Sequence, residues 1–150
     1  MILPNQATPT AAVETFLKAM RVLDGEAVWS AMSQGLKDML TKEFDEMKKG
    51  KELNDFIEEF NAPYLKDCHD PHQFTVMLFK AVREACPDKC ADYAAKLSDS
   101  KIREFLDGAR LEEKGSRAVM KMKDLGSVEL VKEGPNWKVD KLDDFDIFDF

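Results

Sequence analysis

Apolar and polar residues alternate in the last third of the chain, and this pattern predicts a β-sheet. Between residues 109 and 142 apolar side chains recur at every second position within the predicted strands, and charged side chains fill most of the positions between them. Turn-forming residues interrupt the pattern at 114–116, 124–126 and 133–136. The spacing predicts four antiparallel strands with one face buried under helices and the other in water. The buried face is expected to carry Ala118, Met120, Met122, Val128, Leu130, Trp137 and Val139.

Before residue 108 apolar residues recur every three or four positions, which predicts helices. Thr8 is the expected N-cap of the first helix, with Pro9 at its first position and Asp24-Gly25 at its end. Asp70 and Pro71 begin a helix in the middle of the chain in the same way. The remaining helices are predicted at Val28 to Met32, Ser33 to Lys49, Leu53 to Phe60, Asp88 to Leu97 and Ser98 to Leu106. The last of these has Ser98 or Ser100 as its expected N-cap.

Together these elements predict a single α+β domain over residues 1–150. It is helical over 8–107, forms the sheet over 109–142, and ends in an acidic-aromatic tail over 143–150. A length of 150 residues suits one domain with one sizeable core.

Two stretches resemble the nuclear-transport-factor-two-like (cystatin-like) superfamily. They are TPTAAVETFLKAMRVLDGEAVWSAMS at 8–33 and VELVKEGPNWKVDKL at 128–142. The resemblance is to small bacterial, lipoprotein-type domains of unknown function, and it implies a half-cone in which helices pack on a curved sheet. The segment 53–106 adds a helical middle that is longer than is usual in that family. The same fold carries isomerases, cyclases, dehydratases, transport adaptors and binding modules, so the resemblance does not choose among these functions.

The negative net charge of the chain disfavours some classes of binding partner. The chain carries 29 acidic and 22 basic residues, a formal net charge of -7, which disfavours binding to nucleic acid. No apolar run approaches the roughly 20 residues that a membrane span needs. The first ten residues lack the features of a signal peptide. Two interpretations stay open, a cytoplasmic protein or an exported, periplasmic one whose signal has been removed, and the second is favoured.

The cysteines and histidines do not predict a metal site. Cys68, His69 and His72 lie at the start of the central helix, whereas Cys86 and Cys90 lie at its far end, about 22 Å away along the helix axis. The two groups therefore cannot share a metal. Cys86 and Cys90 could form a disulfide in an oxidising compartment, or lie buried as thiols at a helix corner.

No catalytic motif is present, and no cofactor is predicted. Ionisable candidates for a cone interior are Asp140, Tyr64, Tyr93 and His72; alternation places Asp140 on the wet face beside Lys138. A pocket for an apolar ligand is predicted from side chains that could instead be simple core: Phe16, Met20, Trp29, Met120, Met122 and Trp137.

The tail interleaves four large apolar residues, Phe145, Ile147, Phe148 and Phe150, with aspartates. One interpretation is an exposed motif that docks on a partner protein. We favour docking on the protein itself or on a second copy, which would make a homodimer, because four large apolar side chains are costly to leave in water. The favoured function is a non-enzymatic binding or assembly module for an apolar small molecule or a protein partner. The alternative is an isomerase or cyclase-type enzyme acting on an apolar small molecule in the cone.

Overall fold

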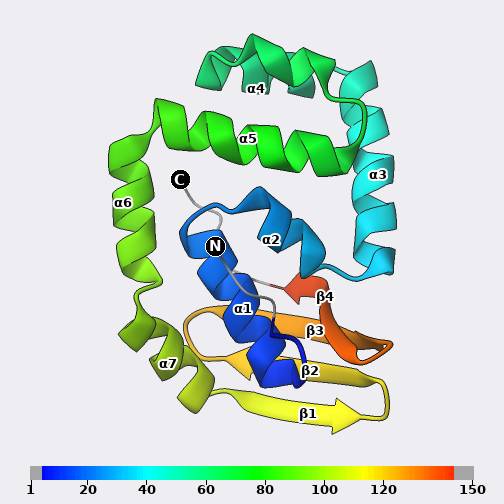
Figure 1. The fold of residues 1–150 in the computed structure, drawn as a ribbon, viewed down its shortest axis with the longest axis vertical. Helices are drawn as coiled ribbons and strands as arrows, with labels where there is room; N and C mark the ends of the chain where they lie inside the picture. The colour runs from blue at the N-terminus through cyan, green and yellow to red at the C-terminus, as the bar shows by residue number, and fades with distance from the viewer. Residues whose placement is uncertain (1–4, 144–150) are drawn as a thin grey trace.

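A computed structural model describes residues 5–143 of the chain. It confirms the α+β class, with a series of helices followed by a four-stranded antiparallel sheet (Figure 1). The predicted tail lies outside the described residues except for Asp143. The helices are α1 (Pro9–Arg21), α2 (Gly25–Ser30), α3 (Gln34–Lys49), α4 (Glu52–Phe60), the 3-10 helix η1 (Pro63–Asp67), α5 (Pro71–Ala85), α6 (Pro87–Lys96) and α7 (Asp99–Asp107).

The helices begin where capping residues were predicted. The side chains of Thr8, Asp70 and Ser98 each accept a hydrogen bond from a backbone N–H in the first turn of α1, α5 and α7. Pro9 and Pro71 occupy the first helical positions, where no N–H is needed.

The sheet has the strand order β1-β2-β3-β4. Its strands are β1 (Arg110–Lys114), β2 (Arg117–Met122), β3 (Gly126–Glu133) and β4 (Asn136–Asp143). A β-bulge lies in β4: Val139 pairs with Leu130 and Lys141 with Glu129, so Asp140 is the extra residue. The apolar residues expected on one face, from Ala118 through Val139, are buried as predicted.

The main core lies between this sheet face and α1, α2 and α7. Phe16 and Leu17 of α1 are buried with Trp137 of β4 in one apolar cluster, which confirms that the stripe of α1 faces the sheet. A second cluster joins α3, α4 and α5 around Phe44 and Phe74. In Figure 1 these three helices form a group beyond α2, while α6 and α7 lead back down to the sheet.

The β4 edge of the sheet is covered by backbone from the N-terminal half. Val139 N donates to Ala31 O and Ser33 N donates to Val139 O, each at 2.8 Å. Trp137 N donates to Gln6 O, also at 2.8 Å. At the opposite edge, every residue of β1 is exposed to solvent. Within residues 5–143 the sheet therefore has one edge that is covered at Trp137 and Val139 and one edge that is open.

One predicted helix boundary has a different role in the structure. Helix α1 ends at Arg21, and the turn after it contains Leu23, whose φ is 52°. Asp24 and Gly25, expected to end α1, instead begin α2, and the Asp24 carboxylate accepts a hydrogen bond from Ala27 N at 3.1 Å. Sequence alone does not separate these roles, because the same residue types end one helix and cap the next.

Candidate functional site

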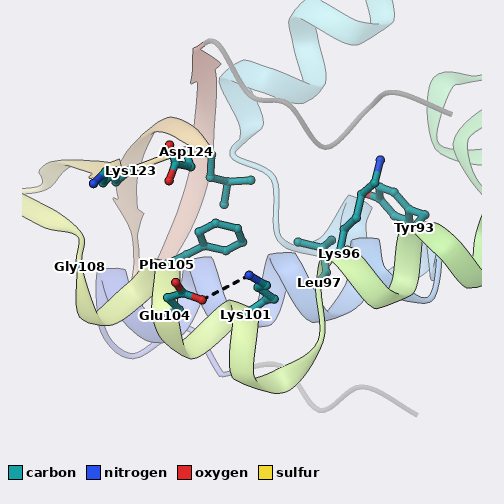
Figure 2. Close-up of a pocket in the computed structure, with 10 residues that line it drawn as sticks. Tyr93, Lys96, Leu97, Lys101, Glu104, Phe105, Gly108, Lys123 and Asp124 are labelled. Atoms are coloured by element: carbon teal, nitrogen blue, oxygen red, sulfur yellow. Dashed lines mark ion pairs between the residues drawn. The ribbon is translucent and has the colours of Figure 1, made fainter.

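A cavity of about 550 Å³ lies where α6, α7 and the β2–β3 turn meet (Figure 2). Three other cavities in the described part of the chain have smaller volumes, of about 230 to 400 Å³. It is lined by Tyr93, Lys96, Leu97, Lys101, Glu104, Phe105, Gly108, Lys123, Asp124 and Leu125.

The floor of the cavity is apolar. Tyr93 of α6, Leu97 at its C-terminal end and Leu125 in the β2–β3 turn are buried, and Phe105 of α7 is half-buried. Figure 2 shows the Phe105 ring in the middle of the cavity, with Tyr93 and Leu97 on one side of it. These side chains offer an aromatic and aliphatic surface of the kind that holds an apolar ligand body.

The rim of the cavity is charged. Lys96, Lys101 and Lys123 are exposed there, together with Glu104 and Asp124. Lys101 Nζ lies 3.6 Å from Glu104 Oε2 along the surface of α7 (Figure 2). Within residues 5–143 no carboxylate forms an ion pair with Lys96 or Lys123. Three lysines against two carboxylates give the rim a positive balance on a protein whose net charge is -7.

The local backbone explains how the β2–β3 turn reaches the cavity. Leu125 N donates to Met122 O at 3.3 Å, and Asp124 takes a left-handed conformation with φ of 66°. This tight reversal leaves Lys123 and Asp124 exposed at the rim and buries Leu125.

Tyr93 is the buried ionisable group of the cavity. Burial raises the pKa of its phenol well above the ordinary value, so the phenol stays protonated at neutral pH. A protonated phenol can donate a hydrogen bond but cannot act as a general base. The chemistry that this arrangement supports best is binding.

The side chains that the sequence predicted as a ligand pocket lie elsewhere. Phe16, Met20, Met120, Met122 and Trp137 are all buried in the main core and do not line this cavity. Trp29, the sixth of them, is half-buried in α2.

Trp29 belongs to a surface cluster that joins three helices. Its ring stacks on His72 of α5 with centroids 5.1 Å apart, and Lys37 Nζ of α3 lies 5.6 Å from the Trp29 ring. His72 Nε2 lies 2.7 Å from Glu26 Oε2 of α2. With cationic and aromatic neighbours around its ring, Trp29 serves to tie α2 to α3 and α5.

Asp140 and Lys138 are also held by neighbours rather than free in water. Asp140, whose side chain is 26 % exposed, accepts a hydrogen bond from Ser33 Oγ at 2.5 Å and pairs with Arg117 at 3.4 Å. Lys138 Nζ does not pair with Asp140; it donates to Ser30 O at 2.6 Å and to Gln6 Oε1 at 2.9 Å. Both residues serve the attachment of the N-terminal segments to β4.

The other ionisable candidates lie outside the cavity. Tyr64 lies in η1 with Lys80 Nζ 5.3 Å from its ring, and burial raises the pKa of its phenol. His69 is exposed, and its backbone N–H donates to Gln73 Oε1 at 2.9 Å.

All three cysteines are free thiols in this structure. Cys68 is buried, whereas Cys86 caps α6 and Cys90 lies one helical turn later, with its Sγ 3.7 Å from Val82 O. Burial raises the pKa values of the Cys68 and Cys90 thiols. Among residues 5–143, no group of three or more His, Cys, Asp or Glu side chains could hold a metal ion.

In the same range, no helix has both the length and the apolar character needed to cross a membrane. Comparison with models of protein families, with curated proteins and with solved structures gave no match to this chain.

Proposed function

We propose that this chain is a non-enzymatic binding module and that the cavity between α6, α7 and the β2–β3 turn is its binding site. The observation that carries the proposal is the combination of an apolar floor with a lysine rim on an otherwise acidic protein. Such a site suits a ligand that joins an apolar or aromatic body to a carboxylate.

Each part of the lining has a role in this proposal. Phe105 and Leu125 would contact the apolar body, and Tyr93 would form the wall behind it. Lys96 and Lys123, which pair with no carboxylate in the described chain, would attract the negatively charged end. The Lys101–Glu104 pair is available to exchange partners when an anion arrives.

The alternative, an isomerase or cyclase-type enzyme, needs an ionisable group that can accept a proton from a bound substrate. The raised pKa of Tyr93 disfavours that role in this cavity. In the proposed cone, Met20, Met120 and Met122 fill the space with apolar side chains. Both observations favour the binding module.

The resemblance to the nuclear-transport-factor-two-like superfamily, a bacterial origin and an exported location remain predictions from the sequence. They are compatible with a small binding module and do not name its ligand.

The proposal can be tested with 8-anilinonaphthalene-1-sulfonate, a fluorescent probe that joins an aromatic body to a sulfonate. We expect saturable binding that the double substitution Lys96→Glu and Lys123→Glu weakens roughly three- to tenfold, because each rim charge contributes a modest electrostatic attraction. Added salt should weaken binding to the unsubstituted chain more than binding to the variant.

A matched control reverses two exposed lysines that lie far from the cavity, Lys42→Glu and Lys51→Glu. It changes the net charge by the same amount and should leave probe affinity nearly unchanged. Equal weakening by both double variants would mean that the probe responds to net charge alone, and the proposed site would then be wrong.

A further inference from the structure

We propose that the occupant of the cavity is the chain's own segment 144–150, bound within the same molecule. This inference rests on the proposed function of the cavity and goes further by naming the ligand. Three features of the described residues support it: where β4 ends, the length of the segment, and the match in chemistry.

Strand β4 ends close to the edge of the cavity. Asp143, its last residue, pairs with Ser127 of β3. Ser127 comes two residues after Leu125 and three after Asp124, both of which line the cavity. With neighbouring strands about 4.8 Å apart and about 3.3 Å per residue along a strand, the chain leaves the sheet about 10 Å from the cavity lining.

The segment is long enough to cross the cavity from that point. Seven extended residues span at most roughly 23 to 25 Å. This length exceeds the roughly 10 Å from the end of β4 to the β2–β3 turn, so the segment is long enough to enter the cavity.

The chemistry of the segment matches that of the cavity. It contains three aspartates, three phenylalanines and one isoleucine. Its apolar side chains suit the floor formed by Phe105, Leu97 and Leu125, and its carboxylates suit the rim lysines. The sequence and the cavity therefore carry complementary patterns of apolar and charged groups.

The apolar groove between α3, α4 and α5 is a weaker match. It is lined by Phe44, Phe56 and Phe74 among other apolar residues, and its charged lining residue is Glu43. A carboxylate there would repel the aspartates of the segment. The groove therefore serves as an alternative destination to be checked in the test.

The test uses the full chain with the tail substitutions Phe145→Ser and Phe148→Ser. If the tail occupies the cavity in most molecules, removing two of its three aromatic side chains should tighten binding of 8-anilinonaphthalene-1-sulfonate about three- to tenfold, since a probe binds only the unoccupied fraction. The amide signals of Tyr93, Phe105 and Leu125 should shift in ¹H–¹⁵N spectra. A synthetic peptide of residues 143–150, added to the tail variant, should displace the probe.

The control variant is Met39→Ser, which removes an exposed apolar side chain of α3 and should change neither probe affinity nor those signals. If the tail variant binds the probe like the unsubstituted chain while the Lys96 and Lys123 reversals still weaken it, the cavity binds anions but the tail does not occupy it. If the lysine reversals also have no effect, the proposed function itself fails.

Two further outcomes would overturn binding within one molecule. Signal shifts centred on Phe44 and Phe74 would place the tail in the groove between α3, α4 and α5. A tail effect that disappears on dilution, together with a dimer in sedimentation, would assign the occupied cavity to a second copy.

Discussion

Leu23 occupies a backbone conformation that leucine rarely adopts. Its φ is 52°, yet its side chain is only 1 % exposed and belongs to the main core. Arg83 donates a hydrogen bond to the carbonyl oxygen of Leu23, which helps to hold this conformation. The favourable burial of the side chain evidently outweighs the strain of the left-handed backbone.

We predict that Leu23→Gly lowers the free energy of unfolding by about 1 to 3 kcal/mol. Removing a buried leucine costs roughly 2 to 5 kcal/mol, and relief of the backbone strain returns about 1 to 2 kcal/mol. The control is Asn61→Gly, at an exposed position with φ of 49°, which should change stability by less than about 0.5 kcal/mol. Denaturant melts measure both; a stabilised Leu23→Gly variant would show that strain, not burial, dominates at this turn.

Lys138 gives the protein a specific pH dependence. Burial lowers the pKa of Lys138, and the nearby charge of Lys37 lowers it further, whereas the unfolded chain keeps the ordinary value near 10.5. Between the lowered pKa and that value the unfolded state binds more protons. The contribution of Lys138 to the free energy of unfolding therefore rises as pH increases between these two pKa values.

We predict that the stability of the unsubstituted chain changes with pH differently from the stability of the Lys138→Met variant. As pH increases from about 8 to about 10, below the ordinary lysine pKa, the unsubstituted chain should gain stability relative to the variant. Other titrating groups are common to both proteins and cancel in the difference. Denaturant melts at several pH values give this difference, and a constant or falling one would contradict the buried position of the Lys138 amine.

At the scale of elements, the close packing of α2 against α5 depends on a glycine. A Cβ atom at Gly25 would lie 2.7 Å from the Cα of Val76, closer than real Cβ contacts. The stack of Trp29 on His72 fixes the same pair of helices nearby. The first turn of α2 therefore lies directly against the backbone of α5.

We predict that Gly25→Ala lowers the free energy of unfolding by about 1 to 3 kcal/mol, the usual cost of overpacking. Gly108→Ala is the matched control, because its nearest contact would be Glu104 O at an ordinary 3.5 Å. That variant should stay within about 0.5 kcal/mol of the unsubstituted chain. Thermal and denaturant melts measure both, and a Gly25→Ala variant of full stability would mean that α2 and α5 are further apart.

The elements themselves were largely predictable from local chemistry. Thr8, Asp70 and Ser98 announce helix starts because a side-chain oxygen can satisfy an N–H of the first turn. Met120 and Val128 alternate with polar residues because one sheet face is buried. These signals lie within a few residues of one another in sequence.

The candidate site was not predictable in the same way. Lys96, Phe105 and Lys123 come from three segments, and each resembles an ordinary residue of a helix or turn. Only the packing of α6, α7 and the β2–β3 turn makes them neighbours. The sequence pointed instead to Met20 and Met122, whose apolar character suits either a pocket or a core, and the structure places both in the core.

At the scale of the whole molecule, the oxidation state of the cysteines depends on the compartment in which the protein is located. Cys86 and Cys90 lie one helical turn apart, about 6 Å along the axis. This spacing falls within the Cα separations of roughly 4.4 to 6.8 Å that disulfides span. If the chain is exported, we expect these two to be oxidised together and Cys68, which is buried, to stay a thiol.

Thiol counting under denaturing, non-reducing conditions tests this expectation. Material purified without reductant from an oxidising native compartment should show one free thiol, and Cys68→Ala should show none. Three free thiols in that material would exclude the disulfide and leave the reduced arrangement seen here.

The two edges of the sheet limit how copies of this protein could associate. Backbone pairing can extend a sheet only through an unpaired edge, and growth into a fibre needs two such edges on every copy. Gln6 and the segment 31–33 already occupy hydrogen-bonding groups of β4, which leaves β1 as the open edge. Two molecules joined through β1 would each offer only the partly covered β4 edge of residues 5–143, so assembly by strand pairing should favour a closed pair over a fibre.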